Sequence, residues 1–386
     1  MPPKGEKSPF VCIWNGNCCL PPKRDARRDV LLDAQTQGER VQQDKLSQVI
    51  GRIGRRVESY GRTNDQIVLQ SHILAVNSMI EAARAGAQGR GFSVVAAEMK
   101  RMSDQTKSMA DSFRQDVLGI VQSAETETAE LVAALESAER ERMVALALNL
   151  VQLIVRNLFE RTADVRWWAT EPALWSALSF AQNGPARGPI GEARLRLQTI
   201  HRYYTVYRDL MLLDLDGRIL ANAAETAQRS LSAEERDWFN RAAALRSGHD
   251  YTVSAVHPNP QDGAPWLVYA ATVRDGGMPD GAPLGVLAVA FNWDREAGLI
   301  VREEAGFTAE EWTRSRVLLL DHEFRILADS DGAPLGSLFA LNHGGADKGC
   351  VQAPDGTLTA FARTIGYQDY DGLGWYGVVV RRPVKG

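Results

Sequence analysis

The residues best suited to metal binding or nucleophilic catalysis are six histidines and four cysteines, and their spacing assembles neither kind of site. Three cysteines crowd the N-terminus without a zinc-type spacing or a nearby histidine: Cys12, Cys18 and Cys19. The histidines are scattered over different segments: His72, His201, His249, His257, His322 and His343. We therefore expect no metal and interpret the cysteines as ordinary thiols in a reducing compartment, with a redox or metal role as the alternative.

Glycine and aspartate motifs come closer to ligand chemistry. The GxxGxG of residues 86–91 has the letters of a phosphate cradle, but a helical pattern precedes it and its spacing is neither that of a Rossmann fold nor that of a P-loop. DLDGR at 214–218 and DSDG at 329–332 lack the later acidic positions of a calcium loop, so hairpin turns explain both. Without a GxSxG elbow or an HExxH helix, we predict no enzyme and no cofactor; a triad assembled from distant residues is the alternative.

Composition narrows the class of partner. The 386-residue chain has 45% hydrophobic residues, a formal net charge of -4 and a pI near 6.0, so nothing favours nucleic acid. The N-terminal segment lacks a signal-peptide core, and the apolar run 143–155 is shorter than a bilayer span and is interpreted as a buried helix face. We expect a cytoplasmic protein without a membrane span.

Long helices must occupy the first half. We expect residues 1–28 to be a basic, loosely ordered leader, and residues 30–165 contain no proline. Apolar residues stepping by three and four mark two helices within 29–142 that fold back at 86–89: Ile50, Ile53, Val57, Tyr60, Asn64, Ile67, Ser71 and Leu74 on one leg, and Phe92, Val95, Met99, Met102, Thr106, Met109 and Phe113 on the other. Each seam must be covered by the other leg or by a second chain.

Glycines explain the reversal. Gly86 and Gly89 are expected to take positive φ at the tip, with Ala87 between them, and Gly91 to let the returning leg pack closely. The result is an antiparallel helical hairpin that becomes a coiled-coil bundle on dimerisation.

A repeat organises the second half. MLLDLDGRILAN (211–222) and LLLDHEFRILAD (318–329) align position by position, each as strand, turn and strand. Two α+β modules follow, at about 183–300 and 301–386, connected to the hairpin by helical residues 143–182. The fold class is therefore mixed, an N-terminal helical hairpin followed by tandem PAS-like α+β modules.

The segment ILAVNSMIEAARAGAQGRGFSVVAAE (73–98) resembles the tip of methyl-accepting chemotaxis receptors. That resemblance implies contacts between receptor dimers, assembled into trimers, through Ile73, Asn77, Glu81 and Arg84. It also implies docking of the adaptor CheW and the histidine kinase CheA on Arg90, Gly91, Phe92, Val94 and Val95. Ala87 replaces the glutamate usual at the turn. No clean methylation pattern is present, although QSAETETAE (122–130) comes near one.

The second half resembles a double Cache sensor, through ERDWFNRAA (235–243) and GYQDYDGLGWYGVVV (366–380). By that resemblance Arg236, Trp238 and Phe239 would line a ligand pocket, and Tyr251 and Tyr269 could join them. The alternative is that Trp238 and Phe239 are core and Arg236 a surface cation. Ala290 stands where amino-acid-binding members carry an aspartate, which disfavours a free amino acid.

These resemblances imply a chemoreceptor-like transducer in which a small molecule bound by the sensor changes helix packing in the hairpin and thereby modulates CheA through CheW. A homodimer is expected. The main alternative is a ligand-binding or oligomerising module without kinase coupling. The ligand, its sign of effect and the higher-order assembly are not defined by the sequence.

Overall fold

The computed structural model describes residues 26–184, 187–224 and 231–383. The expected leader and its three cysteines lie outside these ranges, apart from residues 26–28. The chain divides into two compact units, Met1–Ala134 and Leu135–Gly386. Both contain part of one long helix, α2, whose C-terminal portion belongs to the second unit.

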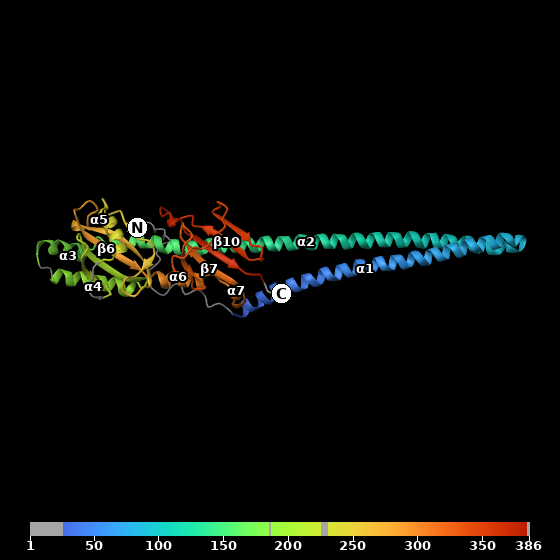
Figure 1. Cartoon of the computed structure of the whole chain (residues 1–386), viewed down its shortest axis with the longest axis horizontal. Coiled ribbons are helices and arrows are strands. Elements are labelled where there is room, and N and C mark those ends of the chain that lie inside the picture. The colour runs from blue at the N-terminus through green and yellow to red at the C-terminus, as the bar shows by residue number, and fades with distance from the viewer. Residues whose placement is uncertain (1–25, 185–186, 225–230, 384–386) are drawn as a thin grey trace, which may run out of the picture. The chain divides into compact units, whose positions relative to one another are not determined.

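The first unit is a helical hairpin. Helix α1 (Ala26–Arg84) leads into a short 3-10 turn, η1 (Gly86–Gly89), and α2 (Arg90–Trp168) returns beside it, as Figure 1 shows. Alanine, leucine, glutamate, arginine and glutamine favour such long helices, and no proline interrupts them. The hairpin and its reversal at residues 86–89 are confirmed.

The second unit contains two antiparallel sheets with the same strand order. The first sheet runs β2-β1-β6-β5-β3, with β4 also pairing to β5, and the second runs β8-β7-β11-β10-β9. The strands of the first sheet are β1 (Tyr207–Asp214), β2 (Ile219–Asn222), β3 (Thr252–Val253), β4 (His257–Pro258), β5 (Pro265–Arg274) and β6 (Pro283–Phe291). Those of the second are β7 (Ser315–Leu320), β8 (Ile326–Asp329), β9 (Lys348–Gln352), β10 (Leu358–Arg363) and β11 (Tyr376–Arg381).

The predicted repeat is confirmed residue by residue. Met211 pairs with Asn222 in the first sheet, and the equivalent Leu318 pairs with Asp329 in the second. Both hairpins carry a register shift at the same place, beside the turn. We call the part of the second unit built on the first sheet module 1 and the part built on the second sheet module 2. The fold class predicted from the sequence, helical hairpin plus tandem α+β modules, is shown by the structure.

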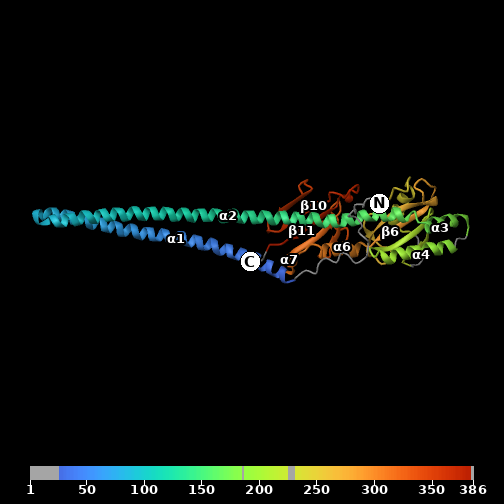
Figure 2. The same ribbon diagram turned by 180° about the vertical axis from the view of Figure 1, so that it is seen from behind.

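Helices cover the sheets. Figures 1 and 2 show α5 (Ala233–Ala243) on one face of the first sheet and α3 (Pro172–Asn183) and α4 (Arg187–Tyr203) on the other. Helix α3 starts at Pro172, whose fixed φ suits the first helical position. Helices α6 (Trp293–Arg302) and α7 (Ala309–Arg314) connect the modules, and short 3-10 turns lie at Asp275–Gly277 (η2) and Gly372–Gly374 (η3).

The C-terminal portion of α2 forms the common core of the second unit. The apolar run 143–155 contributes Met143, Ala147, Leu150, Val151, Ile154 and Val155 to the core cluster that it shares with residues of both sheets. The backbone of Ala147 comes so close to β11 that a Cβ added at Gly377 would lie 2.0 Å from the Ala147 carbonyl oxygen. The predicted buried helix face is confirmed.

One expectation about this run needs correction. Helix α2 contains an 18-residue window that has the length and composition of a membrane span, with 39% of the window buried inside the structure. The run therefore extends further than residues 143–155 suggest. Its buried face packs on the sensor sheets, as the core helix of a folded domain does.

The two repeat turns differ in one informative way. Asp214 Oδ1 accepts hydrogen bonds from the backbone N–H of Asp216 and Arg218, and Gly217 has φ +81°. Asp321 makes the same two bonds in module 2, but Phe324 occupies the glycine position with φ +62°. Hairpin-turn chemistry is thus confirmed for DLDGR. DSDG is different, because it follows β8 as a turn in which Asp329 accepts from Asp331 and Ala333, and it does not connect paired strands.

Candidate functional site

The tip of the hairpin depends on two glycines for different reasons. Gly86 has φ +59°, a conformation that costs L-residues with a side chain about 1–2 kcal/mol. Gly89 has no positive φ; it is buried, and a Cβ there would lie 2.0 Å from the Ala82 carbonyl oxygen. Nothing lies within 4 Å of a Cβ placed at Gly91. The predicted roles of Gly89 and Gly91 are therefore wrong, because close packing is needed at Gly89.

Beyond the tip, α2 presents large apolar side chains to solvent. Phe92 is 74% exposed, and Val94 and Val95 are also exposed. Arg90 and Gly91 are exposed beside them, and Ser93 Oγ donates to the Arg90 carbonyl at 2.8 Å. All five residues predicted to contact the adaptor and kinase are thus accessible to solvent, and we call them together the α2 tip face.

The residues predicted to contact other receptor dimers lie along the last turns of α1. Ile73, Asn77, Glu81 and Arg84 are all exposed. Glu81 and Arg84 form an i,i+3 ion pair at 3.5 Å, which contributes little in water because both side chains are solvated. Ala87, in the turn, is exposed as well. Their role in contacts between dimers stays a prediction.

The two legs meet through small residues rather than through the predicted seam. Ser103 Oγ donates to the Val68 carbonyl across the legs at 3.1 Å, and a Cβ added at Gly61 would lie 3.1 Å from Arg114 Cδ. The buried and half-buried positions repeat every seven residues: Gly54, Gly61, Val68, Ala75, Ala82, Gly89, Ala96, Ser103 and Ala110. Small side chains at this spacing let two helix backbones approach closely.

Ile50 of the predicted seam is buried and Val57 and Met99 are half-buried, but its other large apolar residues stay uncovered within one chain. On α1 they are Ile53, Tyr60, Ile67 and Leu74, and on α2 they include Met102, Met109 and Phe113. Of the two expected covers, the other leg lies over the small-residue stripe next to them, and cover by a second chain stays a prediction. What remains is an apolar surface along one side of the hairpin, which we call the open seam.

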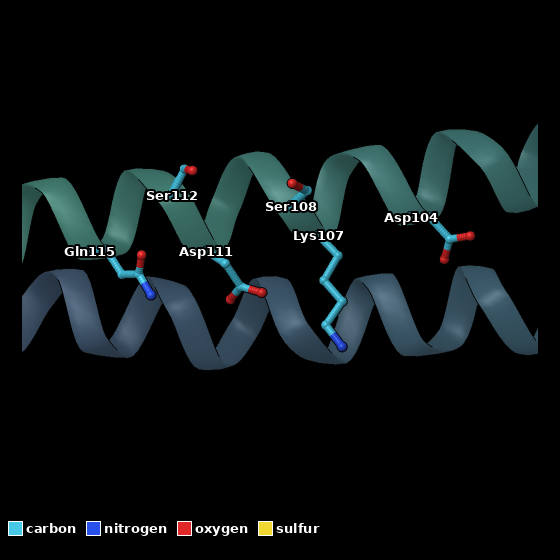
Figure 3. Close-up of a pocket in the computed structure, with 6 residues that line it drawn as sticks. All are labelled: Asp104, Lys107, Ser108, Asp111, Ser112 and Gln115. Carbon is cyan, nitrogen blue, oxygen red and sulfur yellow. The ribbon is translucent and has the colours of Figure 1, made fainter.

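Figure 3 shows a shallow groove between the legs, lined by Asp104, Lys107, Ser108, Asp111, Ser112 and Gln115. Lys107, Asp111 and Gln115 point from α2 toward α1. Nearby, His72 approaches Asp104 at 3.6 Å, and Arg114 approaches Asp65 at 3.9 Å. Because the side chains of both pairs are exposed, each pair contributes little to stability.

In the sensor unit, the five residues predicted to bind ligand do not lie together. Trp238 and Phe239 are buried under α5 against one face of the first sheet, while Arg236, on the same helix, is exposed. Tyr269 lies on the opposite face of that sheet, with Tyr251 partly buried next to it at a ring distance of 6.2 Å. A single cavity lined by all five is therefore excluded by the alternation of side chains along β5; the ligand role of each stays a prediction.

The α5 face of the first sheet carries a cluster of buried apolar side chains. Three small side chains, Ala270, Ala288 and Ala290, lie under the helix in the same cluster as Trp238. The Trp238 Nε1 is buried and has no hydrogen-bond partner among the described residues. An indole N–H is a donor that normally finds a partner when buried. Helix α5 is anchored here by a capping box between Ser232 and Glu235.

Sequence reasoning missed the polar contacts that hold α2 to module 2. Arg381 on β11 is buried and donates to Glu139 at 2.8 Å and to Glu311 at 3.2 Å. Arg142 reaches the same Glu311 oxygen at 3.1 Å. Burial alone would raise the pKa of Glu311, but Thr308, Arg142 and Arg381 outweigh it and hold that pKa below its ordinary value. We call this group the module 2 clasp.

A second missed group holds α2 to module 1. Tyr207 on β1 donates its hydroxyl to Asp164 at 2.5 Å, and Arg161 Nε lies 3.1 Å from the same carboxylate oxygen. Burial raises the pKa of Asp164, although Tyr207 and Arg161 both oppose that shift. No signal in the sequence links residues 164 and 207. The capping boxes, by contrast, were readable as Ser-x-x-Glu and Thr-x-x-Glu.

The architecture therefore defines a class of protein: a helical signalling hairpin with an exposed tip, joined by one helix to tandem sheet modules. Residues 28–166 match the family model of the methyl-accepting chemotaxis protein signalling domain. The resemblance of the hairpin to chemoreceptor tips is confirmed. Among the described residues, no group of three or more histidine, cysteine or acidic side chains is placed to hold a metal ion.

Curated relatives agree over the hairpin. The methyl-accepting chemotaxis protein HlyB of Vibrio cholerae is 31% identical over 109 residues, which is 28% of this chain and 19% of the relative. The aerotaxis receptor of Escherichia coli is 34% identical over 92 residues, 24% of this chain and 18% of the relative. The chain thus spans less than a fifth of the length of these relatives.

Among solved structures, the sensor domain of the histidine kinase DctB from Vibrio cholerae superposes with a TM-score of 0.46 at 16% identity. It covers 66% of this chain and all of that domain.

Proposed function

We propose that this chain is a chemoreceptor-like signal transducer. A small molecule bound by the sensor unit changes the packing of the hairpin and modulates a CheA-type histidine kinase through a CheW-type adaptor. The observation that carries the proposal is the match of residues 28–166 to the chemoreceptor signalling domain, together with the exposed apolar α2 tip face. The proposal places the hairpin in the cytoplasm, with no reaction catalysed.

The α2 tip face supports the kinase arm of the proposal. Exposed large apolar side chains grouped at one place on a monomer are typical of protein contact surfaces. Phe92 and Val95, three residues apart, lie on the same side of the helix and would anchor such a contact. The α1 residues from Ile73 to Arg84 are proposed to contact neighbouring dimers, in assemblies that include trimers of dimers.

The open seam supports a homodimer. Two hairpins placed with their open seams together would bury the large apolar residues of both, as a four-helix bundle does. Burial of a leucine or isoleucine side chain contributes about 1.5–3 kcal/mol, so a few such pairs outweigh the cost of association.

For the sensor, we propose that the ligand binds at the α5 face of module 1, where the Trp238 indole N–H would donate to it. Arg236 is exposed in this structure, so its participation requires its side chain to turn inward. Ligand binding would favour one arrangement of α5 on the sheet, by no more than its difference in affinity for the two arrangements.

Reconstitution with CheA and CheW tests the kinase arm. Purified full chain should co-sediment with both proteins and change the rate of CheA autophosphorylation. The substitution Phe92→Glu should abolish both effects, whereas Leu338→Glu, at a 73% exposed apolar residue of the second unit, should leave them unchanged. If the wild-type chain dimerises but does not alter CheA, the hairpin is an oligomerising module and the kinase arm is wrong.

A further inference from the structure

The loop between β10 and β11, residues 364–375, contacts α2 along two helical turns. Thr364 Oγ1 donates to Gln152 Oε1 at 3.3 Å, and Gln152 Nε2 donates to the Gly366 carbonyl at 3.5 Å. Further along α2, the ring of Tyr367 packs edge-on against Phe159 at 5.2 Å. The Arg156 guanidinium lies over the Tyr367 ring, 5.3 Å from its centre.

The same loop reaches module 1. The Tyr370 hydroxyl lies 3.1 Å from the hydroxyl of Tyr269, which stands on β5 in the middle of the first sheet. Both rings are buried, and burial raises the pKa of each phenol above its ordinary value. The two hydroxyls form a buried hydrogen bond. Removing one of them leaves the other buried without this partner, which costs free energy. A loop of module 2 is thus tied to the central sheet of module 1.

The backbone of this loop is held in a conformation that the chain would not adopt freely. Gln368 has φ +53° and Leu373 has φ +61°, although neither is glycine. Such residues persist only where surrounding contacts determine them. The loop is also tightly packed on the helix: a Cβ added at Gly372 would lie 3.0 Å from a methyl group of Val155. These contacts fix the position of the loop on the helix.

We propose that the β10–β11 loop is a second route, beside the direct contact of Tyr207 with Asp164, by which module 1 and helix α2 sense each other's conformation. A shift of β5 moves Tyr370, and a packed loop transmits the shift to Tyr367 and Gln152 on the helix side. The loop is held by strained residues and by one buried hydroxyl pair, so loss of that pair releases it to a second arrangement. The inference rests on the proposed function only in naming α2 as the helix that carries the signal.

Hydrogen exchange on the full chain, without ligand or kinase, tests the coupling from both ends. Tyr370→Phe changes the module 1 end of the loop and should speed amide exchange of α2 residues 151–159 by a factor of about 5 to 30. Tyr367→Leu changes the α2 end and should speed exchange of β5 amides in module 1. Tyr203→Phe, at an exposed tyrosine of the sensor unit, should change neither segment.

The reciprocal design keeps the inference falsifiable if one variant fails to fold, because each variant reports at the opposite end. Faster exchange confined to residues 364–375 and to the elements at the mutated end would overturn the proposal. Kinase coupling enters neither measurement, so failure of the proposed function would leave this result intact, and the reverse also holds.

Discussion

The Asp209 carboxylate on β1 accepts a hydrogen bond from Asn222 Nδ2 on the neighbouring strand β2 at 3.1 Å. The repeat places Arg316 and Asp329 at the same two positions of module 2, where the arginine donates two hydrogen bonds to the aspartate, at 2.9 and 2.7 Å. The carboxylate has changed strands between the copies. In both it also accepts backbone N–H groups just after the second strand, so each copy secures the same point of the fold.

Because the two carboxylates have different surroundings, their contributions to folding stability should change with pH in opposite directions. Burial raises the pKa of Asp209, so its contribution to stability is fully present below the ordinary value of 3.8 and is lost as pH rises through the raised pKa. Burial would also raise the pKa of Asp329, but hydrogen bonds from Arg316 and from the backbone outweigh it and lower that pKa. The Asp329 contribution is therefore present above 3.8 and is lost as pH falls through the lowered pKa.

Urea unfolding of the full chain from about pH 3 to pH 7 checks both signs. Relative to Asp209→Asn, the wild type should lose stability as pH rises; relative to Asp329→Asn, it should gain. If the free energy of unfolding changes with pH equally in the wild type and in one variant, the pKa shift inferred for that aspartate is wrong.

Gly89→Ala should disrupt the tip. Its Cβ would overlap the Ala82 carbonyl oxygen, and relief requires the legs to separate, at a cost of about 1–3 kcal/mol. Gly91→Ala is the matched control, because its Cβ has open space and alanine is the better helix former by about 1 kcal/mol. Thermal unfolding followed by circular dichroism should show a lower midpoint for the first variant and an unchanged or higher one for the second. Equal midpoints would rule out the close approach.

Arg381→Met should strongly destabilise the sensor unit. The Arg381 side chain is 4% exposed, and its removal leaves Glu139 and Glu311 without their shared cation, a change that costs about 3–5 kcal/mol for a buried pair. The neighbouring Arg382, 62% exposed, provides the control: Arg382→Met should change the free energy of unfolding by less than about 0.5 kcal/mol. Urea unfolding monitored by tryptophan fluorescence distinguishes the two; similar losses would show that the clasp is not specific.

The open seam predicts self-association that charge disrupts. Ile67→Glu combined with Leu74→Glu places two carboxylates on exposed seam positions and should weaken dimerisation by at least about tenfold, which corresponds to about 1.4 kcal/mol. Ser59→Glu with Gln66→Glu adds the same charge at exposed positions outside the seam and should leave the dimer intact. Sedimentation velocity over a dilution series measures both. Loss of the dimer in the control alone would show that the dimer interface lies on another side of α1.

The hairpin was predictable because helix propensity, the absence of proline and the glycines at residues 86–89 all favour the same element. The residues that pack between the two legs could not be predicted in this way. Pattern reasoning selects the largest apolar side chains, such as Ile67 and Leu74, as the buried ones. Close approach of two helices instead selects the smallest, such as Gly61 and Ala75, and hydrophobicity does not rank those highly.

The sensor shows a different limit. The duplication predicted two related modules, and its two copies form the equivalent hairpins β1-β2 and β7-β8. The strand order of the remaining strands is not contained in that repeat. Alternation along β5 also separates Tyr269 from its neighbours, but it does not tell which face α5 will cover. Pairs such as Arg381 with Glu139 join residues 242 positions apart, and a single sequence carries no record of such contacts.

The two repeat turns place different residues at their positive-φ position, Gly217 in module 1 and Phe324 in module 2. A Cβ added at Gly217 would already lie 3.4 Å from the side chains of Leu231 and Phe239, so module 1 has no space for a ring there. In module 2, by contrast, the Phe324 ring packs near the rings of Tyr376 and His343. A chimera that swaps these two turns would therefore destabilise both modules. Phenylalanine would clash with Leu231 and Phe239 in module 1, and glycine would leave a gap beside Tyr376 and His343 in module 2. The turns of the two modules are therefore not interchangeable, although their backbones are alike.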